Sequence, residues 1–417
     1  MSELAKAKEF GRVSGLDKLS EIESRLIRRR MALLGDPPVA IVMGDGRTVS
    51  PGSGKPVGAV IIRDRKTLLK FFVRPERHFG DAYSEGDIEV AGDLVEVLEA
   101  AFRCMSRKSA AGLIKKITAK IMNRPRLNTF AGSRDNIHRH YDIGNDFYRL
   151  WLDERMQYTC AYFPSPSATL EEAQTAKMDH VCRKLMLRPG ETVVEAGCGW
   201  GTLALHMAKQ YGVRVKAYNI SHEQVQSARE RAKAEGLDDR VEYIEDDYRN
   251  ITGAFDVFVS VGMLEHVGAQ YYREFGKVIQ RALKEDGRGL IHSIGRNKAE
   301  LMNPWIEKRI FPGAYPPTLR EMMEIFEPAG FSVLDVENLR LHYAKTLEHW
   351  LERFEKASGP IAGMFDRKFI RAWRLYLAGS IAAFAAGDLQ LFQVVFAKQH
   401  NNDIPWTRAH LYAGMRR

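Results

Sequence analysis

The sequence predicts an α/β protein with a doubly wound, mainly parallel sheet of seven strands, a Rossmann-like arrangement, accompanied by a smaller α+β domain. Three observations predict this fold class. From about residue 190 onward, β-rich runs alternate with amphipathic helical segments, as in strand–helix–strand units. The first of these runs ends in a glycine-rich turn, which is typical of a ligand-binding strand–helix junction. The length of 417 residues exceeds what one core usually organises, so two domains are expected.

The N-terminal part of the chain has the pattern of the smaller α+β domain. A polar, basic helix at 19–35 precedes two β-rich runs, at 39–46 and 57–64, which the turn-forming TVSPGSGK separates. This turn is superficially similar to a nucleotide-binding P-loop. However, Val49 occupies the place of the first glycine, and Pro56 occupies the place of the required Ser or Thr. We therefore predict a hairpin turn rather than a phosphate-binding loop.

Every charged residue between positions 103 and 126 is basic, and AAGLIKKITAKIM within this stretch is amphipathic. One interpretation is a solvated helix face that leads to a linker at NRPRLN. The other is a contact with an anionic membrane surface, where each such cation contributes roughly 1 kcal/mol. Lys115 and Lys116 are the central cations in the second interpretation.

Composition and charge limit the class of protein. No apolar run approaches the roughly 20 residues that a spanning helix needs, and the opening MSELAKAKEF lacks the apolar core of a signal peptide. We therefore expect a cytoplasmic protein. The four cysteines form no CxxC pair, so reduced thiols without a structural zinc site are expected. The net charge of +9 indicates an anionic partner, nucleic acid or an acidic membrane. No aromatic-rich RNA-binding motif accompanies the basic stretch, which disfavours nucleic acid.

The rest of the chain alternates strands and helices in a regular order. We predict strands at TVVEAG, VRVKAYNI, RVEYIED, FDVFVSVG and GRGLIHSIG, later at FSVLDVENLRL and LQLFQVVFAK, and helices around 203–209, 223–235 and 271–283. In such a sheet, ligands bind beyond the carboxyl ends of the strands, where the strand order reverses. The glycine turn lies at one of those ends.

The glycine turn has glycines at alternate positions, Gly197, Gly199 and Gly201, between a strand and a helix. Glycine removes side chains where the backbone approaches a ligand, and the helix presents its amino end. A dinucleotide site would place its third glycine one residue later and an acidic residue near the end of the second strand, but VKAYNIS carries no acid. The spacing favours S-adenosylmethionine, whose ammonium Glu195 can help to hold. A purely structural glycine turn, with Cys198 as a packing residue, is the alternative.

Several longer motifs are similar to those of one enzyme family. They are HYDIGNDFYRLWLDERMQYTCAYF, EAGCGWG, NISHEQ, SVGMLEHVG, LIHSIG, NPWIEKRIFPGAYPP, the Tyr343 region and LQLFQVVFAK. In this order they resemble the cyclopropane-fatty-acyl-phospholipid synthases and their mycolic-acid-modifying relatives, over nearly the whole chain after about residue 130. The resemblance implies a class I S-adenosylmethionine-dependent methyltransferase domain at 131–400, a basic linker at 116–130 and a C-terminal tail at 401–417. Relatives also suggest a homodimer.

Residues 1–115 match less distinctively. Their length and GDAYSEGDIEVAGDL resemble the lipid-engaging domain of the bacterial phospholipid enzymes. We expect the mycobacterial relatives to lack this domain, so that its presence favours a phospholipid substrate over a carrier-bound acyl chain.

The resemblance implies that a methylene group is transferred to the cis double bond of an unsaturated phospholipid acyl chain. A methyl group leaves the sulfonium, and the resulting carbocation loses a proton as the ring closes. In the family the base is thought to be a bound bicarbonate, whose ligands correspond here to Cys160, Glu265, His292 and Tyr343. Tyr and His can donate to the anion's oxygens, while ionised Glu265 accepts its hydroxyl proton, which orients the bicarbonate as a general base. Taken singly, the cysteine, the histidine and the tyrosine also suit ordinary core positions.

The resemblance also implies a set of cofactor contacts. Tyr158 and Thr159 are expected over the methionine end, Glu195 at the ammonium, and Gly197 and Gly199 as the loop backbone. Around the ribose and adenine the expected contacts are Asn219, Ile220 and Gln224, with Asp246 and Asp247 near the adenine edge. Asn219 departs from the family, in which many members carry Thr, although an amide can still hydrogen-bond a hydroxyl. We expect no metal, because EHV lacks the second histidine of HExxH and no cysteine or carboxylate cluster joins His138 and His140.

Substrate access sets a geometric requirement. A mid-chain olefin lies roughly 15 Å below the membrane interface, where a sulfonium is costly. We therefore expect peripheral docking on the inner membrane face and an apolar channel that receives the lifted acyl chain. Candidate channel residues, which could also stabilise the cation or simply pack the core, are Phe163, Trp305, Phe311 and Tyr315.

Three other functions remain open from the sequence. The nearest is a related fatty-acyl C-methyltransferase that gives a methyl- or methylene-branched chain. The second is a small-molecule methyltransferase built on the same sheet. The third is a non-catalytic lipid-binding protein with a vestigial cofactor pocket.

Overall fold

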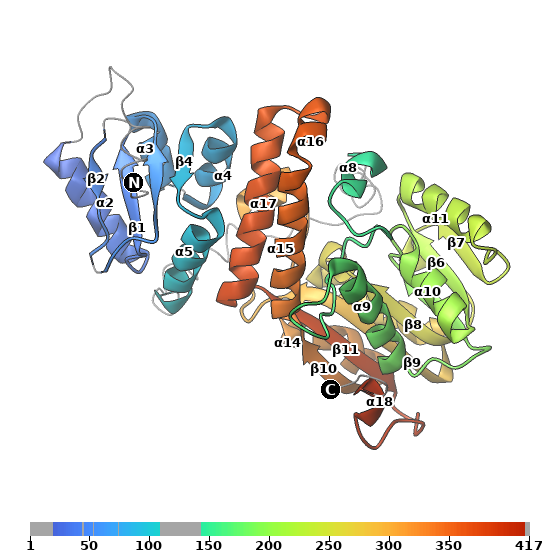
Figure 1. The fold of residues 1–417 in the computed structure, drawn as a ribbon. Coiled ribbons are helices and arrows are strands. Elements are labelled where there is room, and N and C mark those ends of the chain that lie inside the picture. The colour runs from blue at the N-terminus through green and yellow to red at the C-terminus, as the bar shows by residue number, and fades with distance from the viewer. Residues whose placement is uncertain (1–19, 44–45, 53, 74, 109–142, 413–417) are drawn as a thin grey trace. The chain divides into compact units, whose positions relative to one another are not determined.

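The structure, a computed structural model, describes residues 20–43, 46–52, 54–73, 75–108 and 143–412 (Figure 1). The chain groups into two compact units. The N-terminal unit comprises Met1–Arg124, Asn303–Ile310 and Leu347–Leu389, and the sheet unit comprises Pro125–Met302, Phe311–Thr346 and Gln390–Arg417. Most of the predicted basic stretch, with Lys115 and Lys116, lies outside the described residues, as do His138 and His140.

The N-terminal unit contains a four-stranded sheet in the order β2-β1-β3-β4. β1 (Val39–Met43) pairs in parallel with β3 (Gly58–Ile62), whereas β2 (Thr48–Val49) turns back antiparallel on β1. The predicted hairpin between the two β-rich runs is therefore wrong. Both runs are buried along their whole length, as expected of central parallel strands that are covered on both faces. β4 (Ile88–Ala91) completes the sheet antiparallel to β3.

Helices from the first part of the chain bury one face of this sheet. They are α2 (Glu21–Leu33), α3 (Arg65–Val73), α4 (Pro75–Glu85) and α5 (Leu94–Lys108). Ile27, Leu68 and Val97, from α2, α3 and α5, meet the strands in one apolar cluster. α2 begins at a capping box in which the Ser20 hydroxyl accepts from the Glu23 amide and the Glu23 carboxylate accepts from the Ser20 amide.

The N-terminal unit also contains helices from late in the chain. They are α13 (Pro304–Arg309), the part of α15 (Arg340–Lys356) after Thr346, α16 (Ser358–Met364) and α17 (Arg367–Ala386). α17 packs against α4 and α5. Its buried Arg371 donates to the carbonyls of Tyr83 and Ile88 at 2.6 and 3.0 Å and to the Glu89 carboxylate at 3.0 Å. Because α13, α16 and α17 pack there, the compact units do not follow the predicted boundary that kept 131–400 together.

The sheet unit confirms the predicted fold class. Its seven strands lie in the order β10-β11-β9-β8-β5-β6-β7. Their bounds are β5 (Thr192–Ala196), β6 (Arg214–Asn219), β7 (Val241–Glu245), β8 (Phe255–Val261), β9 (Leu283–Gly295), β10 (Phe331–Asn338) and β11 (Gln390–Lys398). Neighbours from β9 to β7 pair in parallel, and β11 lies antiparallel between β9 and β10. All seven strands overlap the predicted runs.

Helices cover both faces of the seven-stranded sheet and form two apolar cores. α9 (Leu170–Lys184), α10 (Thr202–Tyr211) and α11 (His222–Ala234) contribute to one core, and α12 (Tyr272–Ala282) and α14 (Leu319–Phe326) contribute to the other. The chain runs from β5 to β7 in one direction and returns to β8 on the other side of β5, so the strand order reverses between β5 and β8. This reversal point is where such sheets bind ligands. In the ranges that the structure describes, no helix has the length and apolarity to cross a membrane.

Candidate functional site

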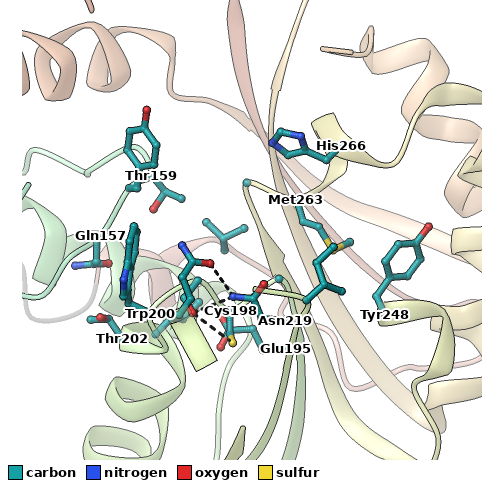
Figure 2. Close-up of a pocket in the computed structure, with 18 of the residues that line it drawn as sticks. Gln157, Thr159, Glu195, Cys198, Trp200, Thr202, Asn219, Tyr248, Met263 and His266 are labelled. Atoms are coloured by element: carbon teal, nitrogen blue, oxygen red, sulfur yellow. Dashed lines mark hydrogen bonds between the residues drawn. The ribbon is translucent and has the colours of Figure 1, made fainter. Parts of the chain in front are cut away.

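A cavity lies at the carboxyl ends of β5, β6 and β8, beside the reversal point (Figure 2). The glycine turn after β5 forms one wall, and the segment that precedes α9 contributes Gln157 and Thr159. All ten predicted cofactor contacts line this cavity: Tyr158, Thr159, Glu195, Gly197, Gly199, Asn219, Ile220, Gln224, Asp246 and Asp247. The structure therefore gathers residues spread over ninety positions of sequence into one place.

The three glycines of the turn have left-handed φ angles of 82°, 53° and 77°. A Cβ at Gly197 would lie 2.8 Å from the Cβ of Met263, and a Cβ at Gly201 would lie 2.5 Å from the Tyr243 hydroxyl. At Gly199 no atom lies within 4 Å of such a Cβ. Packing therefore requires the first and third glycines, whereas the second has open space beside it in the cavity wall.

Glu195 is the buried acid of the cavity, only 2% exposed. Its Oε2 has no hydrogen-bond partner among the described residues. Burial raises the pKa of this carboxyl to about 8, against the opposing charge of Lys177. A buried carboxylate oxygen without a partner is costly unless a donor reaches it, so the position suits a cationic ligand group.

Asn219, at the end of β6, braces the glycine turn. Its Nδ2 donates to the carbonyl of Gly199 at 3.1 Å and to Gln224 Oε1 at 2.8 Å (Figure 2). Its Oδ1 accepts from the Ser221 amide at 3.3 Å. The Asn219 amide, which departs from the family pattern, is therefore already hydrogen-bonded within the protein. This bracing role is a function that the sequence did not indicate.

The two acids after β7 differ in their partners. The Asp247 carboxylate accepts from the Arg249 guanidinium at 2.8 and 2.7 Å and from the Arg249 amide at 2.9 Å. Asp246 Oδ1 accepts from the Asp247 amide at 2.7 Å and from Asn250 at 2.8 Å. Both acids line the cavity, and Asp247 is neutralised by its ion pair with Arg249.

The four residues predicted as anion ligands do not line this cavity, but three of them lie close to it in sequence or by a bond. Cys160 and Glu265 are the neighbours of the lining residues Thr159 and His266, and the carbonyl of His292 accepts from the amide of Gly262, another lining residue, at 2.9 Å. Tyr343 is half-buried on the first turn of α15.

The segment around Cys160 is bonded to the start of α15. The Ala161 amide donates to Thr346 Oγ1 at 3.0 Å, and the Phe163 amide donates to His342 Nδ1 at 2.9 Å. Between them, the Tyr162 ring stacks on His342 with centroids 4.8 Å apart. These bonds hold the residues that flank Cys160 beside the residues that flank Tyr343.

Glu265 and His292 each present one unpartnered buried atom. Glu265 Oε1 accepts from the Ile294 amide at 2.5 Å, while Oε2 has no partner among the described residues. Gln393 Nε2 donates to His292 Nδ1 at 3.0 Å, which places the ring proton on Nε2, and that nitrogen is also unpartnered. Burial raises the pKa of Glu265 to about 7 and, aided by Lys177 and Lys184, lowers the pKa of His292 to about 3. A neutral histidine donor and a carboxyl acceptor therefore remain available to a ligand.

Cys160 is fully buried, and burial raises the pKa of its thiol far above the ordinary value. Its Sγ donates to the Ala161 carbonyl at 3.1 Å. This residue is a neutral thiol and cannot act as a thiolate nucleophile.

The predicted channel aromatics divide between the two units. In the sheet unit, the Phe311 ring lies 6.2 Å from His266, and the Tyr315 amide donates to the Glu265 carbonyl at 2.7 Å. Trp305 belongs to the N-terminal unit, where it packs against Gly80 of α4. Close packing against a glycine explains the position of Trp305 without a channel.

The cavity includes residues that sequence reasoning missed. Among them are Gln157, Trp200, Met263 and His266, which Figure 2 labels, and Lys177. Trp200 lies between two predicted turn glycines and His266 beside a predicted ligand, so both could have been included by adjacency. Lys177 sits inside the helix α9, where nothing in the helical pattern distinguishes it from a surface cation.

Comparisons with known proteins point to one family. Residues 130–394 match the family described as mycolic acid cyclopropane synthetase. A Pseudomonas putida protein described as "Probable fatty acid methyltransferase" is 36% identical over 90% of this chain and 96% of its own. The cyclopropane-fatty-acyl-phospholipid synthase of Escherichia coli K12 is 44% identical over 64% of this chain and 68% of its own. The structure of cyclopropane synthase MmaA2 from Mycobacterium tuberculosis superposes with a TM-score of 0.61 at 29% identity, over 64% of this chain and 98% of that one.

Two further relatives bear on the cofactor and on the N-terminal residues. Mycolic acid cyclopropane synthase CmaA1, complexed with SAH and CTAB, superposes with a TM-score of 0.61 at 30% identity, over 64% of this chain and 98% of its own. The tuberculostearic acid methyltransferase UfaA1 of Mycobacterium tuberculosis is 32% identical over 89% of this chain and 90% of its own. Its coverage shows that the expectation that mycobacterial relatives lack the N-terminal part is wrong for at least one of them.

Proposed function

The chain belongs to the mycolic acid cyclopropane synthetase family, and we propose that it transfers a methylene group from S-adenosylmethionine to the cis double bond of an unsaturated phospholipid acyl chain. Membership makes it a methyltransferase of a lipid-modifying enzyme family. The observation that carries the proposal is the cavity at the reversal point, which is lined by every cofactor contact inferred from the family, by His266 beside Glu265, and by Gly262, whose amide donates to the His292 carbonyl.

The cavity residues suit S-adenosylmethionine in several ways. Glu195 Oε2 is a buried acceptor for the ammonium. The backbone at Gly199 has open space beside it, which permits close approach of the methionine portion. A relative with the same fold forms a complex with SAH, which supports this assignment.

The free groups of Glu265 and His292 are chemically complementary to a small oxyanion that carries one hydroxyl. His292 offers an Nε2–H donor and Glu265 offers an Oε2 acceptor, both buried and without a partner among the described residues. Bicarbonate held there would supply a general base beside the transferred methyl group. The carboxyl of Glu265 orients the hydroxyl of the anion, and Gln393 fixes the tautomer of His292 by donating to its Nδ1. Cys160 and Tyr343 complete the proposed ligand set.

A membrane surface as docking partner is favoured by the outer face of α2. Ile22, Leu26 and Leu33 lie along one side of this helix, at i, i+4 and i+11, and are 69%, 58% and 62% exposed. Exposed arginines at 25 and 28 lie to one side of this stripe, and Arg29 lies on it, between Leu26 and Leu33. A helix side that mixes apolar residues and arginines suits the interface of an anionic bilayer, where the apolar side chains insert and each cation contributes about 1 kcal/mol. We call these six residues the α2 stripe.

A second candidate product has its own support. Two relatives that match about nine-tenths of this chain are described as methyltransferases of fatty acids, not as cyclopropane synthases. The alternative is therefore a fatty-acyl C-methyltransferase that gives a methyl- or methylene-branched chain. The two reactions share cofactor and acceptor and differ in which proton is lost.

Product analysis tests the proposed function. The purified protein is incubated with S-adenosylmethionine and vesicles of a cis-monounsaturated phospholipid, with saturated vesicles as the control. High-field cyclopropane protons in the NMR spectrum of the product support the proposal. New exomethylene signals, absent from the substrate, or methyl-branch signals assign the branched alternative, and an unchanged lipid contradicts both.

A further inference from the structure

Lys177 is a buried cation in the wall of the cavity. It lies on the inner side of α9, is only 2% exposed and lines the same cavity as Glu195. Its Nζ donates to Thr159 Oγ1 at 2.9 Å. A lysine is rarely buried to this extent unless its charge is compensated or used.

The contacts of Thr159 determine whether its hydroxyl donates to a ligand or accepts from it. An ammonium only donates, so Thr159 Oγ1 accepts from Lys177 and its own proton points elsewhere. Gln174, one turn earlier on α9, donates to the Thr159 carbonyl at 2.9 Å and fixes the backbone of this residue. Because Thr159 lines the cavity, its hydroxyl is set up as a donor to a ligand there.

The charges near the amino-acid end of the cavity are complementary. Burial lowers the pKa of Lys177 to about 8, against the charges of the buried acids Asp153 and Glu195, which favour its ammonium form. In turn, Lys177 is the charge that opposes the burial-driven rise in the pKa of Glu195. One anion and one cation in the same wall match an α-amino acid zwitterion, which presents an ammonium and a carboxylate.

We propose that Lys177 is the positioning residue for the amino-acid end of the cofactor: it orients the Thr159 hydroxyl to donate to the ligand carboxylate, in the same cavity wall in which Glu195 accepts from the ligand ammonium. This inference rests on the proposed binding of S-adenosylmethionine. On this proposal, Lys177, which lies in a helix outside the glycine turn, lets the protein distinguish nucleosides that carry an amino-acid end from those that lack one.

Two ligands separate this role from a general effect on the pocket. S-adenosylhomocysteine carries the amino-acid end, whereas 5′-methylthioadenosine keeps the nucleoside and the thioether and lacks that end. Calorimetric titration of the wild-type protein and of Lys177→Met with each ligand gives four dissociation constants. We expect Lys177→Met to bind S-adenosylhomocysteine roughly tenfold or more weakly and to bind 5′-methylthioadenosine within about twofold of wild type, with partial rescue in Lys177→Arg.

The controls keep the outcomes distinct. Retained binding of 5′-methylthioadenosine shows that the Lys177→Met pocket is folded, and Thr159→Val, which removes only the hydroxyl, should weaken S-adenosylhomocysteine binding selectively and by a smaller factor. Equal losses for both ligands, or unchanged binding of S-adenosylhomocysteine by Lys177→Met, overturn the positioning role. If the wild-type protein binds neither ligand, the cofactor assignment itself fails.

Discussion

Two glycines of the turn after β5 should respond differently to the same substitution. Both adopt left-handed φ, 53° at Gly199 and 77° at Gly201, so alanine at either costs about 1–2 kcal/mol of backbone strain. A more restricted unfolded chain offsets about 0.4–1 kcal/mol of that cost. The net loss for Gly199→Ala is therefore about 1 kcal/mol, because its new Cβ meets no atom within 4 Å.

Gly201→Ala adds two further costs. Its Cβ would lie 2.5 Å from the Tyr243 hydroxyl, in a ring that is only 4% exposed. Overpacking of this kind costs about 1–3 kcal/mol. Displacing Tyr243 also breaks its 2.6 Å bond to the Gly201 carbonyl, worth about 1 kcal/mol. The expected total is about 3–5 kcal/mol.

For ligand binding, Gly199→Ala should have a large effect, although its effect on stability is small. Its Cβ would project into the open space where the methionine portion of the ligand is proposed to approach, so we expect roughly tenfold weaker binding of S-adenosylhomocysteine. Urea denaturation followed by tryptophan fluorescence measures the stabilities, and calorimetry measures the affinity. Equal destabilisation by the two substitutions, or wild-type affinity in Gly199→Ala, would refute this account of the turn.

Three further predictions concern the base, the membrane and the N-terminal unit. Because burial raises the pKa of Glu265 to about 7, the carboxyl is protonated below that pH and ionised above it, so kcat/KM should rise as the pH increases through about 7; Glu265→Gln should abolish this step as well as most activity. Replacing Ile22 and Leu26 of the α2 stripe by Asp should reduce co-sedimentation with anionic vesicles severalfold. Met364→Asp, at another exposed apolar position of the same unit, is the control and should leave co-sedimentation unchanged. Equal binding by both variants would contradict the docking role of the α2 stripe. Arg371→Met removes three hydrogen bonds of a buried guanidinium and should lower the free energy of unfolding, measured by urea denaturation, by about 2–5 kcal/mol. Lys368→Met is the control, because its ion pair with Glu85 is exposed, and it should cost less than about 1 kcal/mol. Similar losses in the two variants would contradict a role of Arg371 in holding α17 in the N-terminal unit.

The sequence predicts the seven-stranded sheet well because its signals are local. Each strand is a short β-branched run, and the alternation with amphipathic helices fixes the fold class. The pairing of β1 with β3 could not be predicted in the same way. A Pro-Gly-Ser-Gly turn shows that the chain reverses somewhere, but β2 takes the antiparallel place beside β1, and the parallel partner comes later.

The site divides in a similar manner. Its turn glycines and acidic residues carry recognisable motifs, and the structure brings them to one cavity. Lys177 and Arg371 carry no such signal, since each is one cation within a helix whose function depends on what lies across from it. Glu265 and His292 each retain a buried atom without a partner among the described residues. This depends on how η2 (Leu264–His266), β9 and β11 pack together, which the local sequence does not indicate.

The most direct test of the central claim uses S-adenosylmethionine that carries a trideuterated methyl group. The protein is incubated with this cofactor, bicarbonate and cis-monounsaturated phospholipid vesicles, and the acyl chains are analysed by mass spectrometry and NMR. Methylene transfer with loss of one deuteron from the transferred methyl group predicts a product that retains two deuterons on the ring methylene and shows high-field ring methine protons. A product that retains all three deuterons, or one with two deuterons and olefinic carbon signals that the substrate lacks, would contradict ring closure by deprotonation of the transferred methyl group.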